Sequence, residues 1–401
     1  MAKGTYDVAV LGGGLVGCAM AITLAREEFA VALLDPAPLA MRADPDFDGR
    51  AYAVAPGSRN LLRALGIWEA IAPKAQPVHR ITVTDRTPGP VAPALLHFDP
   101  ADTGAASLGE IVEDRFLRRA LLDGLGDIEH LAGTAATGIT QDPGFARIAT
   151  ANGEVSARLV VCCDGRRSAL ALASGIQYLA WSYQQTGLVS AISHELPHEG
   201  EAHQSFFAGG PFAVLPLTGN RSSLVWSEQD ARAAEIAAMD DAAYMAEIRL
   251  RLDDRLGVAE LAGRRWAYPL GLSLAQNYAA PRVVVAGDAA HGVHPIAGQG
   301  MNLGLRDVAA LAEVLTDAAR RGEDIGSMIV LDRYQQWRRP DATVMALGMD
   351  GLNRLFSTGA APVQAIRNLG MGAVANSGAA KSIFAGLASG SDSNAPRLLR
   401  G

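Results

Sequence analysis

Residues 6–35 read YDVAVLGGGLVGCAMAITLAREEFAVALLD, and this stretch decides the fold. Its hydrophobic pattern predicts a strand, a helix and a second strand, over 6–11, 15–28 and 30–35. Between the first strand and the helix, glycine occupies all three positions of a G-x-G-x-x-G spacing: Gly12, Gly14 and Gly17. A strand, a glycine-rich turn, a helix and a strand within about thirty residues form the βαβ unit of a dinucleotide-binding domain.

Each part of this motif has a physical task. Gly12 allows a tight turn, Gly14 lets backbone N–H groups approach a pyrophosphate, and Gly17 lets the helix pack closely on the strand. The helix N-terminus adds partial positive charge for the phosphates. Asp35 ends the second strand, where its carboxylate can accept hydrogen bonds from ribose hydroxyls. The motif alone does not separate FAD from NAD, and a glycine-rich turn of another α/β protein is the alternative.

Composition narrows the function classes. The formal net charge of −7 excludes the basic face that nucleic acid requires, and it gives no polybasic patch for a membrane. The three cysteines are too few for a disulfide framework and indicate a reducing compartment. The N-terminus lacks the order of a signal peptide, so we expect a cytoplasmic protein. The apolar run 8–25 could nominally span a bilayer, but its consecutive glycines divide it into a buried strand and a buried helix.

A second cofactor-type segment, residues 285–307, reads VAGDAAHGVHPIAGQGMNLGLRD. It predicts a strand ending in a glycine-rich loop that feeds a helix, with Asp288 placed to hold ribityl or ribose hydroxyls. Asn302 and the helix N-terminus offer hydrogen-bond donors to a polar ring edge. Three glycines bring the backbone close to a ligand: Gly298, Gly300 and Gly304. A metal cluster of Asp288, His291 and His294 is the alternative, but no second shell of ligands is apparent.

A third segment is CDGRRS at 163–168, where a predicted strand ends and Asp164-Gly165 follows. The glycine lets the backbone come close to a phosphate, as in the first motif.

The stretch HELPH at 194–198 has the His-Glu-x-x-His spacing of a zinc metalloprotease. That site needs a helix, so that both imidazoles share one face, and Pro197 lies between them. The flanking residues alternate as strands do. We therefore reject zinc proteolysis and expect His194, His198 and His203 at the surface or a sheet edge.

The rest of the chain indicates a dinucleotide-type domain interrupted by a smaller antiparallel sheet. Further helices are predicted over 57–72, 113–126, 231–255, 301–320 and 328–357. Further strands are predicted over 78–86, within a hairpin at 145–163, several times within 185–227, and over 282–288. The tail after Asp392 is expected to fray. The apolar stretch 344–390 is either ordinary core or a surface patch that meets a membrane or a partner enzyme.

The order G-x-G-x-x-G, D-G-x-x-S, G-D-A-A-H-x-x-x-P-x-x-G-Q-G-x-N resembles the flavin-dependent aromatic hydroxylases of the p-hydroxybenzoate hydroxylase fold. Within them, the chain resembles the ubiquinone-biosynthesis hydroxylases, the group that contains 2-octaprenyl-6-methoxyphenol hydroxylase. The resemblance covers nearly the whole chain. The segments that point to this group are DGRAYAVAPGSRNLLRALGIW (48–68), GEIVEDRFLRRAL (109–121), SYQQTGLVSAISHELPHEGEAHQSFFAGGPFAVLPL (182–217) and MDGLNRLFS (349–357).

The resemblance implies FAD as the cofactor. The ADP half would be held by Gly12, Gly14, Gly17 and Asp35, while Arg50 would lie against the cofactor and Pro295 would shape the loop beside the flavin ring. The other cofactor-binding residues it implies are Asp164, Gly287, Asp288, Gly298, Gly300, Met301 and Asn302. His291 and His294 become loop residues with at most polar contacts, and no metal is expected. No general base is marked by spacing.

The implied fold is an α/β (α+β composite) in which a Rossmann-like FAD-binding domain is interrupted by an antiparallel-sheet substrate domain and followed by C-terminal helices. The FAD-binding domain is expected at 1–75, 106–180 and 275–345, the substrate domain at 76–105 and 181–274, and a C-terminal helical segment at 346–401.

The implied activity is hydroxylation of the aromatic ring of a polyprenylated phenol in ubiquinone biosynthesis, with NAD(P)H and O2, through a flavin hydroperoxide. Contact with other quinone-biosynthesis proteins and peripheral contact with the inner membrane are left open. So are hydroxylation of another phenol, and a non-catalytic FAD-binding subunit of a quinone-biosynthesis complex. The absence of a Trp-x-Trp-x-x-Pro segment argues against a halogenase of the same fold.

One departure bears on these alternatives. The related pattern continues Asp-Gly-x-x-Ser-x-x-Arg, and here Ala171 stands at the arginine position. Arg166 and Arg167 are the nearest replacements, from different directions.

Overall fold

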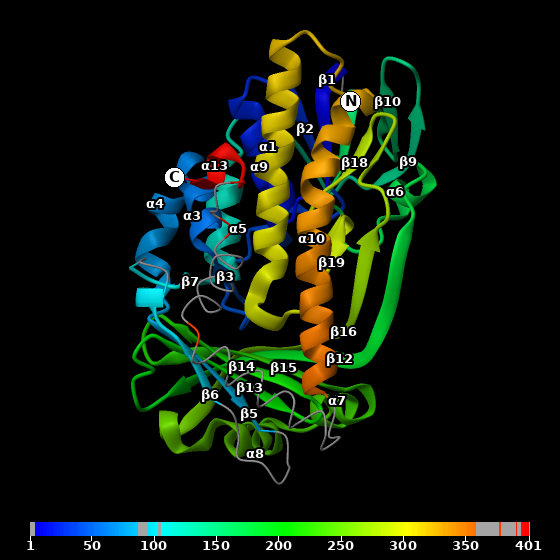
Figure 1. Cartoon of the computed structure of the whole chain (residues 1–401). Coiled ribbons are helices and arrows are strands. Elements are labelled where there is room, and N and C mark those ends of the chain that lie inside the picture. The colour runs from blue at the N-terminus through cyan, green and yellow to red at the C-terminus, as the bar shows by residue number, and fades with distance from the viewer. Residues whose placement is uncertain are drawn as a thin grey trace.

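Two sheets organise the chain, and the computed structural model describes residues 5–86, 95–102, 106–357, 377, 390 and 394–400. In Figure 1 one sheet stands in the upper part of the molecule beside long helices. The other lies below it, and α7 (Asp230–Ala237) and α8 (Asp241–Leu252) cover its outer face.

The upper sheet has the order β17-β18-β11-β1-β2-β8, with β10 and β9 added to β11 as an antiparallel extension. From β18 to β8 the neighbouring strands run parallel. Because parallel strands end at the same edge, the residues that follow β1, β2, β11 and β18 meet there. The strands are β1 (Thr5–Leu11), β2 (Val31–Asp35), β8 (Glu129–Ala132), β9 (Ala136–Gln141), β10 (Ala146–Thr150), β11 (Gly153–Cys162), β17 (Ala279–Ala280) and β18 (Val283–Val285).

Helices enclose this sheet in one large hydrophobic core. They are α1 (Leu15–Arg26), α3 (Pro56–Ala64), α4 (Trp68–Ile71), α5 (Asp114–Gly124), α9 (Gln299–Arg320) and α10 (Met328–Phe356), with α2 (Leu39–Arg42) and α6 (Ala169–Ala173) in connections. Both β1 and α1 are largely buried, so the interpretation of the apolar run 8–25 as strand plus helix is confirmed. Within the part of the chain that the structure describes, no helix combines the length and apolarity needed to cross a bilayer.

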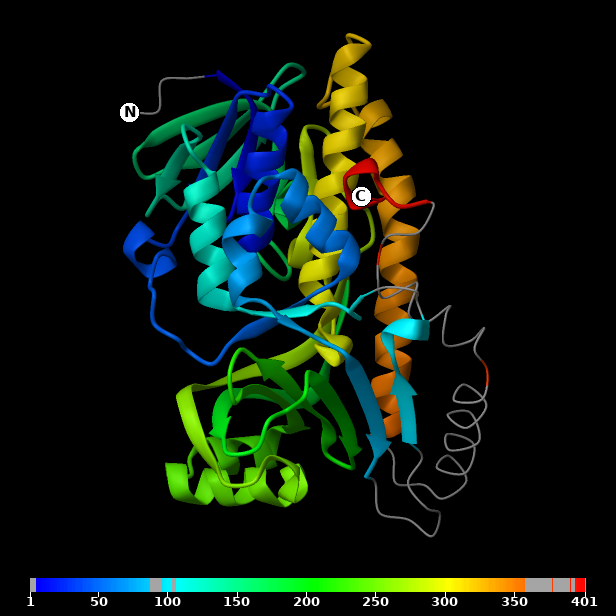
Figure 2. The ribbon, with the colours of Figure 1, turned by 90° about the vertical axis from the view of Figure 1, so that its left-hand side faces the viewer.

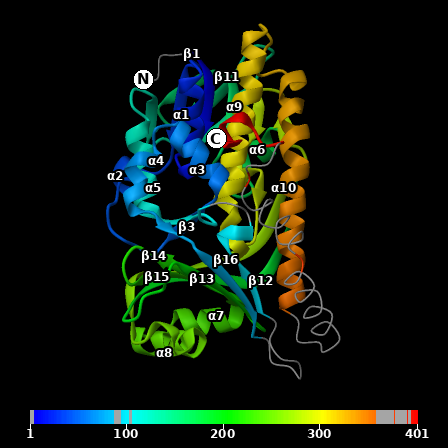
Figure 3. The same ribbon diagram turned by 60° about the vertical axis from the view of Figure 1, so that its left-hand side comes forward.

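The lower sheet has the order β19-β16-β12-β15-β14-β13-β5-β6. It is antiparallel as predicted, except that β5 and β13 run parallel. One face packs on α7 and α8 through Leu188, Trp226 and Ile236, and the other faces the upper sheet and its helices (Figure 3). The strands are β5 (Arg80–Asp85), β6 (Leu95–Phe98), β12 (Tyr178–His194), β13 (Glu201–Phe207), β14 (Gly210–Leu217), β15 (Arg221–Gln229), β16 (Ala259–Ala275) and β19 (His291–Gly292).

A small third sheet, β3-β7-β4, lies between the two large ones (Figure 2). It is formed by β3 (Ala51–Val54), β4 (Gln76–Pro77) and β7 (Glu110–Glu113). It therefore sits where the cofactor edge of the upper sheet approaches the lower sheet.

Two segments that were each predicted as one helix form two helices in the structure. The segment 57–72 divides into α3 and α4 at Gly66, whose φ of 65° is the left-handed conformation that ends helices. The segment 231–255 divides at Asp240, whose carboxylate accepts a hydrogen bond from the N–H of Ala243 at 2.8 Å. That bond is an N-cap, so it starts α8 as a separate helix.

The prediction that the chain frays after Asp392 is wrong for its last described residues. Arg397–Arg400 form α13, which lies beside α9 and α3 (Figure 2). Leu399 is fully buried, and its carbonyl accepts a hydrogen bond from Asn60 Nδ2 at 3.0 Å. Most of the predicted C-terminal helical segment 346–401 lies outside the described residues.

Candidate functional site

The carboxyl edge of the upper sheet brings together the predicted cofactor residues. Gly12 follows β1 and Asp35 ends β2. Asp164 follows β11, and Gly287 follows β18. The pairing of these strands places turns separated by more than a hundred residues of sequence at one edge.

The glycine loop is shaped by close backbone approaches. Gly12 has φ of 99°, and a Cβ there would lie 2.6 Å from the carbonyl oxygen of Cys163. A Cβ on Gly17 would lie 1.8 Å from the carbonyl oxygen of Gly12, so only glycine lets α1 meet β1 here. At Gly14, by contrast, no described atom lies within 4 Å of the Cβ position. The loop therefore keeps open space beside Gly14, at the N-terminus of α1.

Asp35 does not present free oxygens to this space. Its side chain is fully buried and accepts hydrogen bonds from Arg42 Nε at 2.6 Å and Arg42 Nη2 at 3.0 Å, and from the N–H of Ala37 at 3.1 Å. The prediction that Asp35 faces ribose hydroxyls therefore differs from the structure, in which Arg42 holds the carboxylate. A Cβ on Gly13 would lie 2.4 Å from Asp35 Oδ2, so the middle glycine of Gly12–Gly14 makes room for this pair.

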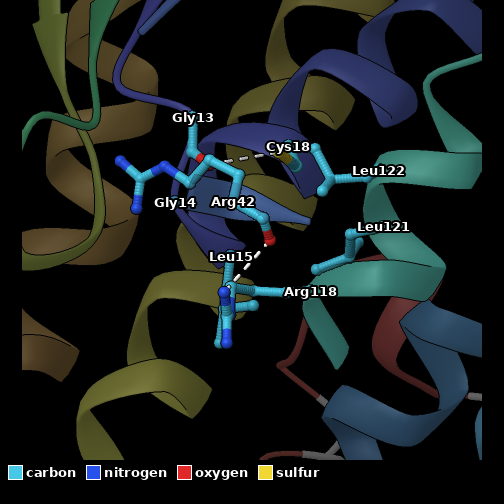
Figure 4. Close-up of a pocket in the computed structure, with 8 residues that line it drawn as sticks. All are labelled: Gly13, Gly14, Leu15, Cys18, Arg42, Arg118, Leu121 and Leu122. Carbon is cyan, nitrogen blue, oxygen red and sulfur yellow. Dashed lines mark hydrogen bonds between the residues drawn. The ribbon is translucent and has the colours of Figure 1, made fainter. Parts of the chain in front are cut away.

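Two guanidinium groups flank the start of α1. A small cavity of about 10 Å³ lies there. Figure 4 shows the residues that line it, which are Gly13, Gly14, Leu15, Cys18, Arg42, Arg118, Leu121 and Leu122. Arg118 Nη1 donates a hydrogen bond to the carbonyl oxygen of Arg42 at 3.1 Å, and Cys18 Sγ donates to that of Gly13 at 3.5 Å. Arg42 is paired with Asp35 and Arg118 with Asp114 at 2.7 Å, so the two guanidinium groups offer a pyrophosphate N–H donors beside the positive end of the helix, not two unpaired charges.

Asp288 is the accessible carboxylate of the second half of the site. Its side chain reaches solvent although protein surrounds much of it, and this burial raises its pKa, with partial compensation by His291 and Arg166. A Cβ on Gly300 would lie 4.0 Å from Asp288 Oδ1. The first turn of α9 and the Gly287-Asp288 turn are therefore neighbours.

The side-chain amide of Asn302 is hydrogen-bonded to backbone groups of the protein. Its Nδ2 donates to the carbonyl oxygens of Ala53 at 2.8 Å and Gly298 at 3.1 Å, and its Oδ1 accepts the N–H of Ala55 at 3.0 Å. The prediction that this amide offers donors to a ring edge therefore differs from the structure, where Asn302 ties α9 to β3. Pro295 and the 3-10 turn Ile296–Gly298 precede it, and Met301 is buried in the core.

Arg50 connects the small sheet to the lower sheet. Its guanidinium pairs with Asp48 at 2.7 Å and Asp114 at 2.9 Å, and it lies 5.0 Å over the ring of Trp266 in β16. Burial acts to lower the pKa of Arg50, but the two carboxylates raise it. Trp266 Nε1 donates to the carbonyl oxygen of Asp48 at 2.7 Å, so the whole group is fixed.

The Asp164 turn is closed by its own serine. Ser168 Oγ donates to Asp164 Oδ2 at 2.8 Å and accepts the N–H of Ala171 at 3.1 Å. Ala171 is fully buried in the core, so its side chain is not on the cofactor edge. Arg166 instead crosses Gly292 and donates to the carbonyl oxygen of Pro269 at 3.3 Å, toward the lower sheet.

The HELPH histidines have structural contacts. His194 is buried at the end of β12, a strand paired on both sides, so the expectation of a surface or sheet-edge position is wrong for this residue. Its ring nitrogens lie 2.8 Å from the carbonyl oxygen of Leu196 and 3.0 Å from Ser222 Oγ. His198 Nε2 lies 2.7 Å from the carbonyl oxygen of Leu217. Both imidazoles thus face protein oxygens. Among the residues described, no three His, Cys, Asp or Glu side chains gather as a metal site would need.

His291 and His294 are also more deeply placed than predicted. Both are fully buried, and His291 is ion-paired with Asp307 instead of forming a loop contact. Burial lowers the pKa of His294 to about 4.

The arrangement fits FAD. The open space at Gly14, the helix N-terminus and the guanidinium pair suit a dinucleotide pyrophosphate, and Asp288 offers an accessible acceptor to polyhydroxyl groups. The family model described as "FAD binding domain" matches residues 5–346. Fold and site thus define an FAD-dependent aromatic-ring monooxygenase, for which NAD(P)H is the co-substrate. Within that class, the chain belongs to the ubiquinone-biosynthesis hydroxylase family.

Three similar proteins illustrate this. Ubiquinone hydroxylase UbiL of Rhodospirillum rubrum is 40% identical, with 98% of this chain and 92% of that protein covered. The 3-demethoxyubiquinol 3-hydroxylase of Escherichia coli is 35% identical, with 94% and 96% covered. The crystal structure of p-nitrophenol 4-monooxygenase PnpA from Pseudomonas putida DLL-E4 has a TM-score of 0.77 at 19% identity, with 96% and 98% covered, which is a likeness of fold.

Sequence reasoning missed the two cations beside α1. Arg42 lies seven residues after Asp35, and Arg118 lies four residues after Asp114 on one helix face. The i,i+4 spacing marks the second pair in the sequence. No spacing rule marks the Arg42–Asp35 pair in the sequence, because these two residues meet only when the connection after β2 folds back.

Proposed function

We propose that this chain hydroxylates the aromatic ring of a polyprenylated phenol in ubiquinone biosynthesis, with NAD(P)H and O2. The observation that carries the proposal is the similarity along nearly the whole chain to proteins named as ubiquinone hydroxylases, at 40% and 35% identity. A second phenolic substrate would use the same fold, so the ring and its substituents are the part that experiment must establish.

FAD, when bound, supplies the reaction with O2 and the transfer of oxygen to the ring. The protein's part is to bind, orient and exclude water. In this proposal the Gly12–Gly17 loop, with Arg42 and Arg118, binds the pyrophosphate end. Asp288 orients the ribityl chain, and the Pro295 loop faces the substrate side. The lower sheet closes the site from below, with Arg50 fixed on Trp266.

An apolar cluster beside this loop suits a polyprenyl tail. It joins Ile296, next to Pro295, to Phe206 of β13 and Phe356 of α10. The two phenylalanine rings are stacked with their centroids 3.9 Å apart and their planes at 23°. We place the tail at this cluster, where the stacked rings move apart to admit it, because the cluster runs from the cofactor loop onto the lower sheet and its side chains are apolar.

The test is mass spectrometry of quinone lipids from a strain that lacks the gene. A precursor that accumulates one hydroxyl group short of the product, and disappears when the gene is restored, is the expected result. An unchanged quinone profile would remove the ubiquinone part of the proposal.

A non-catalytic FAD-binding subunit is the second candidate, because Ala171 replaces the arginine of the related pattern. The purified protein separates the two functions. An enzyme oxidises NAD(P)H with O2 when the phenol is added, whereas a subunit keeps its FAD and never consumes NAD(P)H.

We propose further that the domain boundaries predicted from the sequence follow the two sheets. We also propose that the protein works in the cytoplasm, and that the exposed apolar face of α10 contacts the inner membrane or other quinone-biosynthesis proteins. Val344 is 63% exposed on that face and Leu347 is 49% exposed. Co-sedimentation with vesicles of neutral and anionic lipid, with and without Leu347→Glu, tests the membrane contact.

A further inference from the structure

A buried ionic cluster lies directly behind the cofactor turn. The carboxylate of Asp307, on α9, receives three contacts. The N–H of Gly287 donates to Oδ2 at 2.9 Å, His291 Nε2 lies 2.5 Å from the same oxygen, and Arg338 Nε of α10 donates to Oδ1 at 2.8 Å. The side chains of His291 and Asp307 are 0% exposed and that of Arg338 is 3% exposed. Arg338 also pairs with Asp341.

The groups of the cluster shift one another's pKa values in opposite directions. Burial acts to lower the pKa of His291, but the Asp307 carboxylate outweighs it and the pKa is raised above its usual value. Burial acts to raise the pKa of Asp307, yet His291 and Arg338 lower it. Asp307 therefore favours the protonated form of His291, while Nδ1 of the same ring has no hydrogen-bond partner in the described part of the chain. Removing the carboxylate would leave the buried Arg338 guanidinium and the His291 ring without it, which is far more costly than losing an exposed ion pair.

This carboxylate joins the cofactor turn to both sheets. Gly287 begins the turn that carries Asp288, the accessible carboxylate of the site. His291 begins β19, which pairs with Leu274 of β16 in the lower sheet. Above the turn, Tyr334 of α10 donates to the carbonyl oxygen of Val285 at 3.0 Å and so fixes the end of β18. The position of Asp288 is thus set by contacts that converge on Asp307.

We propose that Asp307 is a positioning residue for FAD: together with His291 and Arg338, it holds the Gly287-Asp288 turn so that Asp288 faces the cofactor. The proposal rests on the assignment of Asp288 to the cofactor site. It does not depend on which phenol is hydroxylated, because its test measures FAD alone.

A dependence on pH follows from the charge on His291. The groups that face it are Asp307 from α9, Arg338 from α10 and Asp288 from its own turn, with the ring of Tyr278 at 6.3 Å. Because its pKa is raised in the folded protein, the ion pair is complete at low pH and is lost as pH rises through that pKa. FAD affinity should therefore fall on the alkaline side of the ordinary histidine range.

The main test is Asp307→Asn in the full chain, with the Kd for FAD measured by flavin fluorescence between pH 6 and 9. The amide can still accept from Gly287, but it carries no charge for the two cations. We expect a Kd raised about tenfold or more, as for loss of a hydrogen bond to a charged group, and no alkaline step. His291→Gln should likewise remove the step, since it keeps a donor without the charge.

The matched control is Asp324→Asn. Asp324 pairs with Arg282, which is 6% exposed and precedes β18 at the end away from the cofactor. This variant also takes a carboxylate from a buried arginine, so its thermal stability should fall while its FAD Kd and pH profile stay unchanged. An Asp307→Asn protein with the Kd and pH profile of the wild type would overturn the proposal.

A second measurement needs no variant that could fail to fold. The His291 pKa is followed by NMR of histidine-labelled wild-type protein with and without FAD. If protonated His291 favours FAD binding, linkage requires FAD to raise the pKa of His291. A pKa unchanged by FAD would also overturn the proposal. If these tests succeed while no phenol is hydroxylated, the positioning role stands and the proposed function fails.

Discussion

Replacing Gly14 by valine separates folding from cofactor binding. Gly14 has φ of −74° and ψ of −176°, an extended conformation that valine adopts readily. Apart from its chain neighbours, no described atom lies within 4 Å of its Cβ position, so the backbone there has room for a side chain. We expect the free energy of unfolding to change by about 1 kcal/mol or less, mainly because valine is a poorer N-cap than glycine.

The effect on FAD should be far larger. The added atoms occupy the space beside the N-terminus of α1 through which backbone N–H groups would reach the pyrophosphate. Loss of two hydrogen bonds to a charged group at about 1.5–3 kcal/mol each corresponds to roughly a hundredfold to ten-thousandfold rise in Kd.

The assay pairs thermal unfolding of the FAD-free protein with FAD titration by fluorescence quenching. Gly144→Val is the matched control, because Gly144 also has no described atom within 4 Å of its Cβ position but lies in an exposed turn away from the edge. A yellow Gly14→Val protein that retains one FAD per chain through gel filtration would refute the site. A Gly14→Val protein that unfolds as readily as a core variant would refute the inference of open space.

Three further outcomes are expected. The double variant His194→Ala/His198→Ala should lose roughly 1–3 kcal/mol of the free energy of unfolding through lost buried hydrogen bonds, while the folded protein keeps near-normal activity that EDTA does not change. Activity that collapses and returns with zinc would contradict this. Phe356→Ala should raise KM for a long-tailed phenol more than for a tail-free analogue, and equal effects on both substrates would count against the tail site. Burial lowers the pKa of His294 to about 4 in the folded protein, so the unfolded chain takes up this proton first as pH falls below 6.5 and the free energy of unfolding drops by about 3 kcal/mol. His294→Gln should remove this loss, and identical pH profiles of stability for variant and wild type would contradict the burial argument.

The sequence was sufficient for the parts of the site that depend on local spacing. The run from Gly12 to Gly17 needs only one strand and one helix to acquire its geometry, and the structure gives both. Asp288 and Gly300 belong to a single strand–loop–helix segment, and they are neighbours in space as well. These parts of the site are predictable from local sequence patterns because the contacts that shape them lie mostly within one short segment.

What the sequence could not reveal depends on partners far along the chain. The ion pair of His291 requires Asp307, sixteen residues on, and Asp307 is in turn held by Arg338 on the next helix. No spacing rule pairs those helices before their packing is known. Leu399 belongs to a tail with weak local preference, which is held by contacts with α3 and α9. The break before α8 is different, because Asp240 is a residue type that commonly caps helices and marks the break in the sequence itself.

The strand order of the upper sheet determines when each strand can pair during synthesis of the chain. β1 pairs with β2 soon after both leave the ribosome, but its other neighbour is β11, and β18 completes this side only at Val285. At about 5–20 residues per second, the interval between Leu11 and Cys162 lasts roughly 8–30 seconds. Until β11 has been made, the glycine loop lies at an open sheet edge lined with apolar residues. The nascent chain is therefore a natural client for chaperones, and FAD can stabilise it only late in translation.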